Sequence, residues 1–235
     1  LVDLSLDVKR VSRLVETTDA DAWIVCAGSR SILDWFACQD FPTFTLFGGS
    51  LDRRFAGAGP NKKPAYRECV NVLIELGHRR IVLLAKSQRR KPIPGESEQT
   101  FIEALEEGGI EVGEFHLPDW DDRKESLLYC LDSLFKLTPP TAFIIQEATV
   151  FTAVQQFLAN RGLKVPADVS LICSDPDPTF TWCEPTIAHI AWRTQPIVRR
   201  IIRWADKISR GKKDLIKSFA NAQFIEGGSV GVAKD

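Results

Sequence analysis

The stretch Pro139–Asp177, PPTAFIIQEATVFTAVQQFLANRGLKVPADVSLICSDPD, decides the fold of this chain. It opens with an uncharged apolar run, Ala142–Ile145, of the kind that forms a strand buried on both faces. Apolar residues then recur at the spacing of one helix face until Gly162, a residue that tolerates positive φ and can end a helix. A second apolar run follows at Val169–Cys173. The stretch therefore predicts a strand, a helix and a second strand parallel to the first.

Polar residues follow each of these two strands. Gln146 and Glu147 come directly after the first, and Ser174 and Asp175 come directly after the second. Parallel strands joined by a crossover helix end at the same sheet edge, which is where α/β proteins bind ligands. Gln146, Glu147 and Asp175 are therefore the first candidate ligand-binding residues. Ordinary loop and cap residues occupy such positions too, so the pattern alone leaves both interpretations open.

The alternation of strand and helix extends along most of the chain. Helical spacing predicts further helices at Asp7–Thr17, at Ser31–Cys38, after Pro64, around Phe101, around Leu127 and at Gln195–Gly211. Further strands are predicted at Ala22–Cys26, Thr43–Phe47 and Ile81–Ala85, with a short one near Ala222–Ile225. Leu51–Asn61, rich in glycine and basic residues, is interpreted as a loop or crossover. The pattern predicts an α/β fold with parallel sheets, and the glycine-rich crossover suggests two of them.

Composition narrows the class of protein. The 235 residues are 44% hydrophobic and 26% charged, with a net charge of −1, whereas a free-standing nucleic-acid binder is usually basic. Because there is neither an apolar run of membrane-spanning length nor a signal-like amino end, we expect no membrane partner. The six cysteines form no CxxC pair and are interpreted as free, mostly buried thiols. That interpretation predicts a reducing, cytoplasmic location.

No pattern for catalysis or for a metal appears. The three histidines are isolated, and the glycine-rich and nucleophile motifs of common enzymes are absent, so we expect no catalytic residue, metal or cofactor. For His78, in a predicted helix-to-strand turn, we expect a structural hydrogen bond. We expect the acidic run Asp119–Asp122 to cap a helix near Ser126. The basic run Arg89–Lys91 fits a solvated loop or a contact with an anionic ligand.

Other candidate ligand-binding residues stand where strands end. Ser29 and Arg30 follow the Ala22–Cys26 strand, and Ser87 follows the Ile81–Ala85 strand. Trp120 and Trp192 lie near predicted strand ends or loops, where an indole ring can stack on a sugar or another flat ligand. Packing in the core or at its rim is the alternative role of each ring.

Several stretches together resemble the effector-binding domain of LacI/GalR-type transcription regulators. Leu73–Ile81 (LIELGHRRI) is similar to the helix–turn–strand signature of that family, and Arg161–Ser170 (RGLKVPADVS) to its second signature. Pro185–Pro196 resembles the segment that returns to the first lobe, and Gly227–Ser229 resembles the usual ending.

The resemblance implies the type I periplasmic-binding-protein-like fold, with two Rossmann-like lobes around a cleft. It implies an N-terminal lobe at 1–58 and 193–218, a C-terminal lobe at 59–192 and a tail at 219–235. The first strand–helix–strand unit of that fold is expected to be missing here. An N-terminal DNA-binding head is likewise expected outside this chain.

The resemblance also implies roles for single residues. Gln146-Glu147 stands where the family has a sugar-contacting Asn-Asp pair, Asp175 matches the family aspartate, and Trp120 matches a pocket tryptophan. An arginine expected just before Phe101 is replaced by Ser97 or a neighbour.

The function implied is that of a LacI-family regulator. Its small-molecule effector, a sugar or sugar derivative, would close the lobes and alter the binding of operator DNA by a homodimer. A solute-binding protein of a transport system shares this fold and is the alternative.

Overall fold

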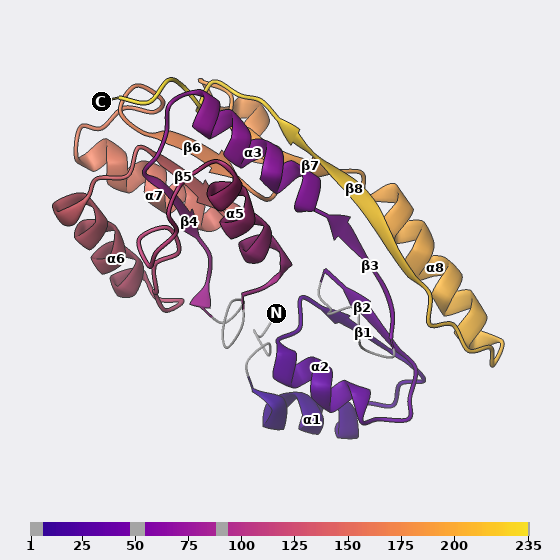
Figure 1. The fold of residues 1–235 in the computed structure, drawn as a ribbon. Helices are drawn as coiled ribbons and strands as arrows, with labels where there is room; N and C mark the ends of the chain where they lie inside the picture. The colour runs from indigo at the N-terminus through magenta and orange to yellow at the C-terminus, as the bar shows by residue number, and fades with distance from the viewer. Residues whose placement is uncertain (1–6, 48–54, 88–93, 235) are drawn as a thin grey trace. The chain divides into compact units, whose positions relative to one another are not determined.

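The computed structural model describes residues 7–47, 55–87 and 94–234. The chain divides into two compact units (Figure 1). Unit 1 comprises residues Leu1–Asn61 and Arg193–Asn221, and unit 2 comprises Lys62–Trp192 and Ala222–Asp235. The basic run 89–91 lies outside the described residues. Over the described residues, no helix is both long and apolar enough to cross a membrane.

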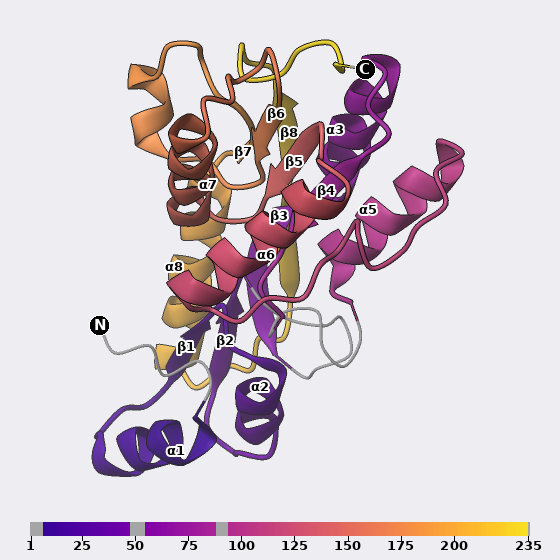
Figure 2. The same cartoon turned by 90° about the vertical axis from the view of Figure 1, so that its left-hand side faces the viewer.

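Unit 1 contains a parallel sheet with helices on both faces. Its strands are β1 (Trp23–Cys26), β2 (Thr43–Leu46), β3 (Ala56–Asn61) and the first half of β8 (Lys217–Ile225). Helices α1 (Val8–Thr17) and α2 (Arg30–Ala37) lie side by side (Figure 2) and share a core with Phe55. On α8 (Gln195–Ser209), Trp204 packs on Phe44 of β2 with ring centroids 5.2 Å apart.

Unit 2 has the larger sheet. Strands β4 (Ile81–Leu84), β5 (Ala142–Ile145), β6 (Ser170–Cys173) and β7 (Ala188–Trp192) run parallel in that order. The second half of β8 pairs with β7 in the antiparallel sense. The helices are α3 (Lys63–Glu75), α5 (Glu96–Glu107), α6 (Lys124–Leu137) and α7 (Ala148–Asn160), with a 3-10 turn, η1, at Pro178–Trp182.

Alternate residues of the unit 2 strands face two separate cores. Ile81, Leu83 and Ile144 pack with α3 and α5 on one face, while Val82 and Phe143 pack with α6 and α7 on the other. Because side chains alternate across a strand, a strand covered on both faces needs apolar residues at every position. This is why β4, β5 and β6 are short uncharged runs, and why they were predictable. The α/β fold with two Rossmann-like units is therefore confirmed.

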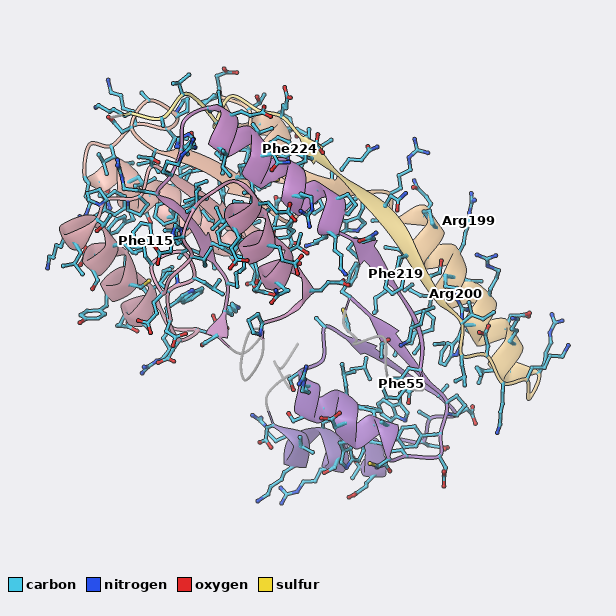
Figure 3. The ribbon with its side chains drawn as sticks, viewed as in Figure 1. Phe55, Phe115, Arg199, Arg200, Phe219 and Phe224 are labelled. Atoms are coloured by element: carbon cyan, nitrogen blue, oxygen red, sulfur yellow. The ribbon has the colours of Figure 1, made fainter. Side chains whose placement is uncertain are left out.

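Strand β8 takes part in both units. Because its first half pairs with β3 and its second half with β7, the strands follow one another in the order β1-β2-β3-β8-β7-β6-β5-β4. Figure 3 labels Phe219 in its first half and Phe224 in its second; Phe224 is buried with α3 and α5, whereas Phe219 is half exposed.

Three strand assignments from sequence need correction. The stretch Leu51–Asn61 was interpreted as a loop, but Ala56–Asn61 is β3. Its small residues do not give the apolar pattern that predicts a strand. Glycine is required at position 57 because a Cβ there would lie 2.7 Å from Oγ1 of Thr45. Strand β7 was not predicted. Strand β8 begins five residues before the predicted Ala222. The prediction missed its first half because polar and half-exposed side chains alternate there.

The cysteines and His78 also have defined places. All six cysteines are free, as predicted, but only Cys69, Cys130 and Cys173 are buried, whereas Cys26 and Cys38 are exposed.

His78 makes the structural hydrogen bonds expected of it. Its ring accepts from the Thr141 hydroxyl at 2.9 Å and donates to the carbonyl of Gly231 at 2.9 Å.

Candidate functional site

The carboxyl ends of β4, β5 and β6 meet at one edge of the unit 2 sheet. The register pairs Leu84 with Ile145 and Ile145 with Cys173, so the residues after these strands are neighbours. We call the side chains at this edge, with those that contact them, the polar edge. Its members are Lys62, Tyr66, Lys86, Ser87, Glu98, Trp120, Asp122, Gln146, Glu147, Ser174, Asp175 and Trp192.

A buried amide–carboxylate pair lies at the end of β5. Gln146 is 7% exposed and donates a hydrogen bond from Nε2 to the carboxylate of Glu98 on α5, which is 3% exposed. The Oε1 atom of Gln146 is buried and has no hydrogen-bond partner within the part of the chain that the structure describes. Because leaving a buried acceptor unsatisfied costs about 1–3 kcal/mol, this oxygen favours a ligand that donates a hydrogen bond.

Asp175, after β6, is bound to the ammonium of Lys62. The same ammonium donates to the carbonyl of Ser174 at 2.8 Å and lies 4.7 Å from the ring centroid of Trp192. The hydroxyl of Tyr66 donates to that of Ser174 at 2.8 Å. Burial raises the pKa of Tyr66 well above its usual range, so the phenol keeps the proton that it donates to Ser174.

A second lysine organises the other end of the polar edge. Lys86, after β4, lies 3.0 Å from the carboxylate of Glu147 and 2.8 Å from that of Asp122. Burial alone would lower the pKa of Lys86, but its hydrogen bonds to these carboxylates outweigh burial and raise the pKa, which keeps the side chain charged. The acidic run was expected to cap a helix, but the N-cap of α6 is Arg123 and makes no side-chain cap bond.

Trp120 is 4% exposed beside this lysine. Its carbonyl accepts a 2.9 Å hydrogen bond from the Ser87 hydroxyl. Its buried Nε1 has no hydrogen-bond partner in residues 7–47, 55–87 and 94–234. The residue also lines a cavity of about 200 Å³ with Asp122, Leu127 and Val150. An indole N–H in this position favours a ligand acceptor.

The structure brings together six of the eight candidate residues. Ser87, Trp120, Gln146, Glu147, Asp175 and Trp192 all belong to unit 2 and contact the polar edge. Ser29 and Arg30 belong to unit 1, where Ser29 caps α2 by accepting from the backbone N–H of Ile32 at 3.4 Å.

Six members of the polar edge were not among the candidates from sequence: Lys62, Tyr66, Lys86, Glu98, Asp122 and Ser174. Lys62 was hidden because it follows β3, which had been interpreted as a loop. Tyr66 was assigned only to a helix face, although its hydroxyl reaches Ser174. The resemblance predicts a replaced arginine just before Phe101. In this part of the chain, the group that contacts Gln146 is the Glu98 carboxylate.

The polar edge offers groups that suit the binding of a small polar molecule. It offers carboxylates, ammonium groups, an amide, hydroxyls and two indole rings, which together recognise small polar ligands by hydrogen bonds and stacking. Within residues 7–47, 55–87 and 94–234, no group of three or more His, Cys, Asp or Glu side chains could hold a metal ion.

Comparison with known sequences identifies the family. The sequence profile of the periplasmic-binding-protein-like domain matches residues 70–230, which include the polar edge from Lys86 to Trp192. The chain belongs to the periplasmic-binding-protein-like domain family. The two motifs that carried the resemblance, Leu73–Ile81 and Arg161–Ser170, both lie inside the matched range.

Relatives within this family are transcription regulators. The repressor CytR of Escherichia coli K12 is 30% identical over 125 residues, which are 53% of this chain and 36% of CytR. The fold matches CcpA of Lactococcus lactis with a TM-score of 0.81 at 17% identity, covering 98% of this chain and 86% of that one. A complex of the regulator CelR with cellobiose matches with a TM-score of 0.78 at 19% identity, covering 94% and 69%. The LacI/GalR resemblance is thus confirmed, and the chain spans about a third of the length of CytR.

Proposed function

We propose that this chain is the effector-binding part of a LacI/GalR-type transcription regulator and that the polar edge of unit 2 contacts the effector. The proposal rests on two buried polar atoms that have no hydrogen-bond partner among the described residues, Oε1 of Gln146 and Nε1 of Trp120. One requires a donor and the other an acceptor, and a small polar ligand can supply both.

A sugar or a sugar derivative is the class of effector that fits first. Hydroxyl groups can donate to the carboxylates and the Gln146 amide, and an indole such as Trp192 can cover a sugar face. CelR, a structural neighbour, is known in complex with cellobiose. Four carboxylates and two ammonium groups at the polar edge add ionic interactions to these contacts.

In this proposal the effector acts by shifting a conformational equilibrium. A ligand changes the affinity of a regulator for DNA only if it binds one conformation better than another. The DNA contact, a homodimeric assembly and a cytoplasmic location belong to the proposed whole regulator. Relatives such as CytR are repressors, which favours a sensor over an enzyme.

A thermal-shift screen of sugars, sugar phosphates and nucleosides tests the proposal, because a specific ligand raises the melting temperature by mass action. We expect at least one compound to stabilise the chain. The same compound should change the affinity of the full-length protein for its operator DNA. A compound that binds tightly without any effect on DNA binding would favour the alternative, a solute-binding protein.

A further inference from the structure

The ammonium of Lys62 is held by the kinds of groups that proteins use to bind cationic ligands. It forms an ion pair with Asp175, donates to the carbonyl of Ser174 at 2.8 Å and lies over the ring of Trp192 at 4.7 Å. A carboxylate, a carbonyl and an aromatic face all stabilise an ammonium ion. Lys62 itself makes no side-chain cap bond to α3, so its charged end has no second structural task at that helix.

The surroundings of this cation are rich in acceptors. Among the described residues, the partner of the buried Glu98 carboxylate is the neutral amide of Gln146. The Oε1 atom of that amide has no donor from any residue that the structure describes. The other lysine of the polar edge, Lys86, is already bound by Glu147 and Asp122. A ligand that enters beside Asp175 therefore meets uncompensated acceptors, and an ammonium group satisfies them best.

We propose that Lys62 is an intramolecular occupant of a cation subsite formed by Asp175, the Ser174 carbonyl and the Trp192 ring, and that the effector is a primary amine, such as an amino sugar, whose ammonium displaces Lys62. The inference rests on the proposed function of the polar edge and narrows its ligand class. A neutral hydroxyl placed on Asp175 would give this part-buried carboxylate a neutral partner in place of an ammonium, which is costly. An incoming ammonium replaces the ion pair with an equivalent one.

The Lys62 side chain then limits the affinity of the subsite for amine ligands. A side chain attached beside the subsite competes at a high effective concentration, so it weakens the binding of every free amine. Shortening Lys62 to alanine removes the competitor and leaves space for an alkylammonium. Lys62→Arg keeps a cation in place and serves as the matched control.

The test is titration calorimetry of the 235-residue chain with n-butylammonium, D-glucosamine and D-glucose. We expect Lys62→Ala to bind n-butylammonium and D-glucosamine at least about tenfold more tightly than the wild type or Lys62→Arg, because the competitor is gone. The double variant Lys62→Ala/Asp175→Asn should lose this gain, and D-glucose should show no difference among the variants. If the alanine variant does not fold, Lys62→Met keeps the aliphatic stem, and methylammonium becomes the probe.

Two results would overturn the inference. The first is equal amine affinity in the wild type, Lys62→Ala and the double variant. The second is tighter binding of D-glucose than of D-glucosamine, with a loss of D-glucose binding in Lys62→Ala, which would make Lys62 a contact for a neutral ligand. In that second case the proposed function stands and only the ligand class is wrong. The absence of any ligand in the effector screen would count against the proposed function itself.

Discussion

The ammonium of Lys62 and the carboxylate of Asp175 form an ion pair inside unit 2, although 113 positions separate them in the chain. Lys62 directly follows β3, and Asp175 is the second residue after β6. Asp175 is the residue that best matches a ligand contact, and its carboxylate is already bound by the Lys62 ammonium. Binding at Asp175 must therefore replace an existing interaction, which makes the charge of the ligand decisive.

Arg200 and Asp214 provide the strongest test of stability in unit 1. Two nitrogens of the guanidinium lie 2.7 and 3.2 Å from the two carboxylate oxygens, and the side chains are 6% and 1% exposed. We expect Arg200→Met to lower the free energy of unfolding by about 3–5 kcal/mol, because a buried carboxylate loses its main partner. Lys207, 3.1 Å from Asp214, would keep the loss toward the lower end of this range.

The neighbouring Arg199 is the matched control for that variant. It is exposed on the same helix (Figure 3), so Arg199→Met should change the free energy of unfolding by less than about 0.5 kcal/mol. Urea unfolding of both variants makes the comparison. Equal losses in the two would show that the buried ion pair does not stabilise unit 1.

Two leucines on α6 test the packing of the second core in unit 2. Leu131 is fully buried against β4 and β5, whereas Leu128 on the same helix is 36% exposed. Leu131→Ala should cost about 2–5 kcal/mol through lost burial and the cavity that remains. Leu128→Ala should cost clearly less in the same urea titration. Similar costs would mean that α6 does not pack on the sheet through the Leu131 face.

Gly227 explains part of the Gly227–Ser229 motif. A Cβ at this position would lie 2.4 Å from the backbone nitrogen of Ala188 and 2.5 Å from the carbonyl carbon of Ile187. Backbone atoms cannot move aside as a side-chain tip can, so Gly227→Ala should shift the chain at β7 and lower the melting temperature by several degrees. Gly113→Ala, where a Cβ meets nothing within 4 Å, should leave it almost unchanged. A thermostable Gly227→Ala variant would contradict this packing.

His78 predicts a fall in stability on mild acidification. Burial lowers its pKa, an effect that a hydrogen bond to the Gly231 carbonyl only partly opposes. The unfolded state, with a pKa near 6.5, then takes up the proton first as the pH falls. The stability that the neutral ring contributes is therefore present above pH 6.5 and is lost below it, at no more than about 1.4 kcal/mol per pH unit for one proton.

The variant His78→Gln isolates this effect. Unfolding free energies from urea titrations at pH 7.5, 6.5 and 5.5 should decline less steeply in the variant than in the wild type. The variant should also be less stable at pH 7.5, because it loses part of the contact with Thr141 and Gly231. Equal pH slopes in the two proteins would show that His78 does not titrate as expected.

Strands β4, β5 and β6 could be predicted because each is buried on both faces and so contains only apolar residues at its centre. Strand β3 could not, since Ala56, Gly57 and Ala58 leave no apolar pattern and owe their place to close contact with β2. The same difference governs the site. Gln146 and Asp175 could be placed because they come just after predictable strands. Lys62 and Glu98 lie in other parts of the chain, and only the tertiary structure shows that they contact Asp175 and Gln146.

If the polar edge of unit 2 binds the effector, a change in this edge must weaken binding. The most direct test is to measure the dissociation constant of the best compound from the screen for three proteins. These are the wild type, Asp175→Asn and the control Asp206→Asn, whose carboxylate is exposed on α8 in unit 1. We expect Asp175→Asn to weaken binding at least about tenfold, the scale of one charge-assisted hydrogen bond, and Asp206→Asn to leave it unchanged. An unchanged dissociation constant in Asp175→Asn would contradict the assignment of this edge as the effector site.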